Sequence, residues 1–232
     1  MEESEARVHF RVIRFIHEAG LRLRIGSVSL ATACVVYHKF FSEYSVNDFD
    51  PYLIGSTAVY LAGKIEEEHV KLRDVVNVCY KTLHRRKPPL EVGDTFTALH
   101  ESIAACELFV LRCLAFRVSF IHPHKFLLHY LKSLQNWFLR KDWENLPIAS
   151  TSWALLRDSY HSNMCLKYPP EHIAVAVIYL ALLCYGAEVP YNKYAETPWW
   201  KAICDGVTIE NIHSIITSIT ATYEMETTFC KS

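Results

Sequence analysis

Two charged side chains fall on helical stripes that are otherwise apolar. Lys64 follows Tyr60 by four residues, and Glu107 stands four residues after Ile103 and four before Leu111. Charges are rare on a face that packs into a core, so each of these two needs a partner. A cation and an anion on two helices in the same half of the chain indicate a site that faces another molecule.

Ordinary explanations exist for both charges. Lys64 lies near the C-terminal end of its expected helix, where the helix dipole favours a cation. It could also form a local ion pair with one of the acidic residues that follow it, and Glu107 could pair with a nearby base. These alternative partners are Glu67 and Glu68 for Lys64, and Arg112 and Lys71 for Glu107.

A histidine cluster raises the question of a metal. His122, His124 and His129 lie close together in the sequence. Zinc needs three or four converging ligands, and no cysteine or carboxylate stands within the turn that follows. We therefore expect these histidines to cap a helix start, with no metal and no cofactor. Nucleophile-elbow, phosphate-loop, dinucleotide and H-E-x-x-H motifs are all missing, so we expect no catalytic residue and no enzyme.

The cysteines and the lengths of the apolar segments indicate the cellular compartment of the protein. None of the eight cysteines forms a C-x-x-C pair, which favours free, buried thiols in a reducing compartment. The acidic first residues do not resemble a secretory signal. The longest apolar run, residues 173–185, is shorter than the ~20 residues of a membrane span. We expect an intracellular protein with no membrane partner.

The balance of charge disfavours nucleic acid as a partner. Lys and Arg number 24 against 25 Asp and Glu, whereas proteins that bind phosphate backbones usually carry a basic excess. One short basic run stands out, residues 84–87 before Pro88 and Pro89. We interpret it as a solvated loop.

The backbone breakers predict an all-α fold. Glycine and proline total 16 of 232 residues, and no segment shows sustained strand-like alternation. Gly20 is placed to end the first helix, Ser27 to cap the second, and Asp50 with Pro51 to start the third. The expected helices are residues 7–19, 27–42, 51–67, 73–82, 96–114, 124–137, 147–162, 170–185, 199–204 and 208–223.

The two halves resemble each other. Residues 54–62 align with residues 173–181 at an offset of 119, and each segment belongs to the third helix of its half. This indicates a duplication with domains at 1–121 and 122–232. At the same offset, Lys64 corresponds to Leu183, so the charge is confined to the first half.

Several motifs resemble the cyclin family. Residues 61–67, Leu-Ala-Gly-Lys-Ile-Glu-Glu, resemble the cyclin-box signature, and residues 107–116 resemble the family's fifth helix. Residues 36–41 and 120–125 are similar to the transcription-type cyclins T, K and L. Residues 133–137, 154–161 and 198–200 together resemble one individual member of that group.

The resemblance implies two tandem five-helix cyclin-box bundles that bind and activate a cyclin-dependent protein kinase. By the family's pattern, Lys64 donates to backbone carbonyls of the kinase αC helix and Glu107 accepts from backbone N–H groups. The implied apolar floor is formed by Leu61, Ile65, Leu114 and Phe116. Residues 8–12 depart from the M-R-A-I-L patch with which cell-cycle cyclins dock substrates.

Two other classes remain open. A general transcription factor core also has two cyclin-like repeats and would bind DNA together with a DNA-bound protein. A helical enzyme could use the histidines of the second half. The neutral charge disfavours the first class, and the missing zinc ligands disfavour the second.

Overall fold

The computed structural model describes residues 2–190 and 196–229, with side chains for 5–190 and 196–225. The chain forms two compact units, residues 1–120 and 121–232. No strand occurs within the described ranges, which confirms the all-α prediction. None of the described helices is both long and apolar enough to cross a membrane.

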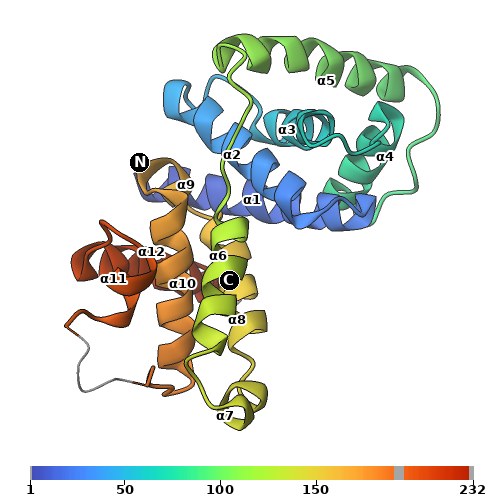
Figure 1. The fold of residues 1–232 in the computed structure, drawn as a ribbon. Coiled ribbons are helices and arrows are strands. Elements are labelled where there is room, and N and C mark those ends of the chain that lie inside the picture. The colour runs from blue at the N-terminus through green and yellow to red at the C-terminus, as the bar shows by residue number, and fades with distance from the viewer. Residues whose placement is uncertain (1, 191–195, 230–232) are drawn as a thin grey trace. The chain divides into compact units, whose positions relative to one another are not determined.

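The first unit is built around one central helix. Helix α3 contacts all four of its neighbours and lies among them in Figure 1. It is buried along most of its length, as the apolar residues of its sequence predict. The helices are α1 (Glu2–Leu23), α2 (Ser27–Glu43), α3 (Pro51–Ile65), α4 (Leu72–Leu83) and α5 (Asp94–Cys113).

Gly20 does not end the first helix, contrary to the prediction. Helix α1 continues to Leu23, and the chain turns at Arg24, whose φ is +58°. A Cβ atom on Gly20 would lie 2.2 Å from Leu30 Cδ2 and 3.0 Å from Ile25 Cδ1. The glycine therefore permits close packing rather than a helix stop.

The start of α3 is as predicted, whereas the start of α2 is not. The Asp50 carboxylate accepts the N–H of Tyr52 at 2.9 Å, with Pro51 in the first turn. At α2 the N-cap residue is Gly26 instead of Ser27, and Gly26 has no side chain with which to cap. A carboxylate from beyond α3, that of Glu68, caps this helix instead. It accepts the Gly26 N–H at 2.9 and 3.1 Å and the Ser29 hydroxyl at 2.6 Å.

The second unit is also organised around one helix, α10, which packs against α6, α8 and α12. The aligned segments 54–62 and 173–181 thus lie on the central helix of their respective units. Two short helices, α7 and α9, bring the described part of the second half to seven helices where five were predicted. The bounds are α6 (Pro123–Gln135), α7 (Arg140–Asn145), α8 (Ile148–Ser159), α9 (Met164–Lys167), α10 (Pro170–Cys184), α11 (Trp199–Ile203) and α12 (Ile209–Phe229).

Proline, glycine and threonine mark helix ends in the second unit. Pro147 and Pro198 stand at the N-cap positions of α8 and α11. Gly186 follows α10 with a φ of +59°, as is common for a helix end. The Thr208 hydroxyl accepts the Asn211 N–H at 3.3 Å and so caps the start of α12.

Candidate functional site

Lys64 and Glu107 meet in space. The Lys64 ammonium lies 2.7 Å from Glu107 Oε1 and 2.9 Å from Oε2, which joins the last turn of α3 to the second half of α5. The local alternatives considered from the sequence are therefore not the principal partners. The pair lies at the surface, with the Lys64 side chain 49% exposed and that of Glu107 16% exposed.

An aromatic ring contributes to the same site. Lys64 Nζ lies 4.4 Å from the centre of the Tyr60 ring, one helical turn earlier. Partial burial acts to lower the pKa of Lys64, but the contacts with Glu107 and Tyr60 outweigh it and raise the pKa above its ordinary value. Lys64 is thus held as a cation. Tyr60 was not singled out from the sequence, although its spacing of four from Lys64 is the signal that could have identified it.

The four predicted apolar site residues divide into two classes. Leu61 is 3% exposed and Leu114 is 8% exposed, so both belong to the core beneath the surface. Ile65 is partly exposed, and Phe116 is 60% exposed. The predicted apolar floor therefore presents Phe116 and part of Ile65 to solvent, whereas the two leucines are buried.

A strained turn places Phe116 at the surface. Ala115 and Phe116 both adopt left-handed backbone angles, with φ of +49° and +56°. The Phe116 N–H donates to the Leu111 carbonyl at 2.9 Å, which closes the end of α5. Left-handed non-glycine residues cost about 1–3 kcal/mol each and are concentrated at functional sites. An exposed phenylalanine on such a turn is consistent with a contact surface.

Leu108 is a further exposed residue that the sequence prediction missed. It directly follows Glu107 on α5, and 48% of it is accessible to solvent. Helix α5 is unusual for a 20-residue helix, because only Ile103 and Val110 are buried. Much of the surface of α5 is therefore available to another molecule. The number of apolar residues in its sequence would instead predict that more of the helix is buried.

The histidines of the second unit are structural, but they do not cap their helix. His122 occupies the N-cap position without a side-chain capping bond, and its Nδ1 lies 3.2 Å from the Tyr160 hydroxyl. The His124 ring contacts Trp153, with ring centres 5.2 Å apart. Burial lowers the pKa of each histidine to about 4. In the part of the chain that is described, no group of three or more potential ligands could hold a metal ion.

The cysteines follow the prediction of free, buried thiols only in part, because Cys106, Cys113 and Cys165 are partly exposed and Cys184 is exposed. The seven described cysteines form no disulfide, and Cys230 lies outside the described residues. Cys34, Cys79 and Cys204 are buried, and burial raises the pKa of the Cys79 thiol to about 11. Cys184 was expected in the core but is exposed, since it is the last residue of α10.

Comparison with known proteins identifies the family. The family model described as "Cyclin, N-terminal domain" matches residues 2–119, just over half of the chain, and "Cyclin-T2-like, C-terminal domain" matches residues 135–222. Human Cyclin-T2 is 30% identical over 210 residues, which cover 90% of this chain and 28% of the relative. Human Cyclin-K is 29% identical over 223 residues, 95% of this chain and 37% of the relative.

A solved structure has a similar fold. A chain of the yeast RNA Pol II CTD kinase CTDK-1 complex superposes with a TM-score of 0.71 at 15% identity, covering 96% of this chain and 67% of that chain. The chain spans about a third of the length of the two relatives above. With a matched N-terminal domain followed by a matched C-terminal domain, the chain belongs to the cyclin family and consists of two tandem cyclin-box repeats.

Proposed function

We propose that this chain is the activating regulatory subunit of a cyclin-dependent serine/threonine protein kinase, and that residues 1–121 bind the kinase. The observation that carries the proposal is the Lys64–Glu107 pair at the surface, close in sequence to exposed apolar residues on α5 and its final turn. The relatives are cyclins, and the solved structures of similar fold include kinase complexes.

The proposed contact exchanges one set of hydrogen bonds for another. In the free chain, Lys64 and Glu107 satisfy each other. On binding, the Lys64 ammonium donates to backbone carbonyls of the kinase αC helix, and Glu107 accepts backbone N–H groups. Phe116 and Ile65, the more exposed of the four apolar residues, pack against that helix, while Leu61 and Leu114 belong to the core.

Activation follows from positioning. A protein kinase must hold its β3 lysine and αC glutamate together to place the ATP phosphates. A subunit that binds one αC arrangement in preference to another shifts the equilibrium toward that arrangement. The cyclin chain performs no chemistry itself and needs neither a cofactor nor a metal for this role.

The proposal of one particular cyclin and kinase rests on three sequence segments in the second half of the chain. Residues 133–137, 154–161 and 198–200 together resemble cyclin Q, whose kinase partner is cyclin-dependent kinase 10. We propose this kinase as the partner in a 1:1 heterodimer, located in the nucleus with some in the cytoplasm. In the third of these segments, residues 198–200, the two tryptophans have a packing role, because Trp199 and Trp200 both contact the Tyr179 ring.

Co-purification after coexpression with cyclin-dependent kinase 10 tests the proposal. The charge-exchanged variant K64E/E107K should lose the kinase while its helical circular dichroism is unchanged. The control is R140E/E144R, which exchanges another exposed ion pair, on α7, and should retain the kinase. Retention of the kinase by K64E/E107K would exclude this face. The unaltered chain could instead fail to bind this kinase and capture another cyclin-dependent kinase. That result would exclude cyclin-dependent kinase 10 as the partner but not the role as a kinase-activating cyclin.

A further inference from the structure

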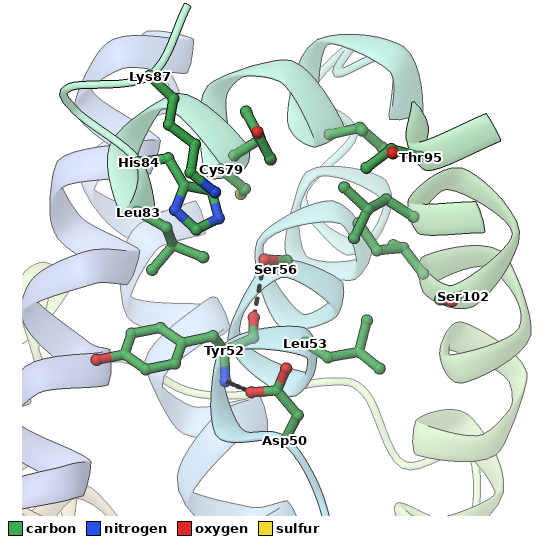
Figure 2. Close-up of a pocket in the computed structure, with 14 residues that line it drawn as sticks. Asp50, Tyr52, Leu53, Ser56, Cys79, Leu83, His84, Lys87, Thr95 and Ser102 are labelled. Carbon is green, nitrogen blue, oxygen red and sulfur yellow. Dashed lines mark hydrogen bonds between the residues drawn. The ribbon is translucent and has the colours of Figure 1, made fainter. Parts of the chain in front are cut away.

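A second candidate binding site lies in the first unit. A groove of about 630 Å³ opens between the start of α3, the C-terminal half of α4 and the start of α5 (Figure 2). Its floor is apolar, because Val76, Cys79 and Ile103 are each at most 3% exposed. Leu53 at the groove is eleven residues from Lys64 on α3, about 16 Å along the helix. The α3 lining of the groove is therefore distant from Lys64, whereas Ile103 on α5 lies four residues from Glu107.

The first half of α5 forms one side of the groove. None of residues 94–102 is buried. Leu53, Leu83 and Leu99 line the opening, and Leu83 is 41% exposed. Aliphatic side chains that line a concave surface, with a volume within the range of about 300–1,000 Å³ typical of ligand sites, favour a bound apolar group.

One end of the groove is basic. His84 and Lys87 lie together there, beyond Leu83 in Figure 2. The loop that carries them is held in place by Lys81, whose ammonium donates to the carbonyls of Arg85 at 3.1 Å and Lys87 at 2.7 Å. Arg85 is neutralised by an ion pair with Glu18. Among the described residues Lys87 has no ion-pair partner, so its charge is available to an anionic group.

The groove also offers hydrogen-bond acceptors. The Ser56 hydroxyl donates to the Tyr52 carbonyl at 2.8 Å, and the Ser102 hydroxyl donates to the Ala98 carbonyl at 2.7 Å. Each hydroxyl hydrogen is thus used within its own helix, whereas the oxygen retains lone pairs. Both serines line the groove, Ser56 on α3 and Ser102 on α5 (Figure 2). Such acceptors suit the N–H groups of an extended peptide.

We propose that this groove binds an extended peptide segment of a partner protein that carries an aliphatic side chain next to an acidic one. The aliphatic side chain enters between Leu53, Leu83 and Leu99. The carboxylate of the neighbouring Asp or Glu pairs with Lys87. Backbone N–H groups of the segment donate to the Ser56 and Ser102 oxygens. Alternating side-chain pockets and main-chain hydrogen bonds are the usual basis of recognition for extended peptides.

Fluorescence anisotropy with the full chain and synthetic peptides tests this proposal. The probe is a fluorescein-labelled peptide of Gly and Ser that carries one Leu flanked by two Asp residues. Matched peptides replace both Asp by Lys, or Leu by Ala. The Asp–Leu peptide should bind at least about tenfold more tightly than either matched peptide, since both the charge pair and the apolar contact contribute.

Two pairs of variants locate the binding. K87E should weaken the Asp–Leu peptide at least about tenfold and strengthen the Lys–Leu peptide. Its control is R86E, which makes the same charge change at an exposed neighbour that does not line the groove. Leu83→Ser should weaken binding, whereas Leu21→Ser, at an exposed leucine on α1, should not.

Equal binding of the acidic and basic peptides would overturn the proposal, as would equal effects of K87E and R86E. A preference for the Lys–Leu peptide would indicate that Asp50, at another part of the rim, sets the charge preference, and it would likewise overturn the assignment to Lys87. K87E and Leu83→Ser should each leave kinase co-purification unchanged. The proposal for the groove and the proposal for the kinase-binding face can therefore be contradicted independently of each other.

Discussion

Lys64 and Glu107 form a bidentate ion pair between α3 and α5, although 43 residues separate them in the sequence. Lys64 is also held over the Tyr60 ring. The two charges that the sequence places on apolar stripes are thus fixed relative to each other before any partner binds.

The pair should contribute little to the stability of the free chain. A double-mutant cycle with Lys64→Met and Glu107→Gln should give a coupling energy of about 0.2–1 kcal/mol, because exposed ion pairs are well solvated. Urea unfolding followed by circular dichroism measures it, and added salt should reduce it. A coupling energy well above this range would assign the pair to the architecture of the unit instead of its surface function.

The sequence identifies these two residues but not their pairing. Periodicity is a local property, and a charge that violates a helical stripe is visible without knowledge of the fold. Which charge meets Lys64 depends on how α3 packs against α5. The local candidates, Glu67 and Glu68, were equally reasonable until that packing was known. The same reasoning applies to Tyr60, whose role depends on the rotamer of the Lys64 side chain.

Gly20 shows where local rules fail in predicting the fold. A glycine near the end of an apolar helical run predicts a helix C-terminus. Here the close approach of Leu30 requires a residue without a side chain, and α1 continues for another three residues. Such a contact joins two helices, so no pattern within α1 contains it. The start of α3 was predictable because Asp50 and Pro51 act on their own helix.

The long-range cap of α2 provides a second test. Glu68→Gln should lower the free energy of unfolding by about 1–2 kcal/mol, because the charged acceptor of the Gly26 N–H and Ser29 hydroxyl is lost. Urea denaturation at neutral pH measures the change. Glu67→Gln removes the same charge one residue away, at an exposed position, and is the matched control. Equal effects of the two variants would show that only net charge matters.

The turn after α5 should be improved by glycine. Ala115 has a φ of +49°, so Ala115→Gly removes the steric cost of a left-handed Cβ and should stabilise the chain by about 1 kcal/mol. The midpoint of urea unfolding should rise. Ala104→Gly, at an exposed position inside α5, should destabilise by about 1 kcal/mol and serves as the control. A loss of stability in Ala115→Gly would contradict the proposed strain at this turn.

The buried histidines should make stability depend on pH. His122 and His124 have pKa values of about 4, below the ordinary 6.5 of the unfolded chain. Between these values the unfolded chain binds protons that the folded chain does not, so stability falls as the pH falls from 6.5 toward 4.

The expected slope is about 1.4 kcal/mol per pH unit for each of the two histidines. Urea unfolding between pH 7 and pH 5 measures it. His124→Gln should reduce the slope by about half, because one of the two titrating groups is removed. His129→Gln, at an exposed position on α6, should leave the slope unchanged. A free energy of unfolding that does not change over this range would mean that both imidazoles titrate in the folded chain as they do in the unfolded chain, and would contradict the prediction.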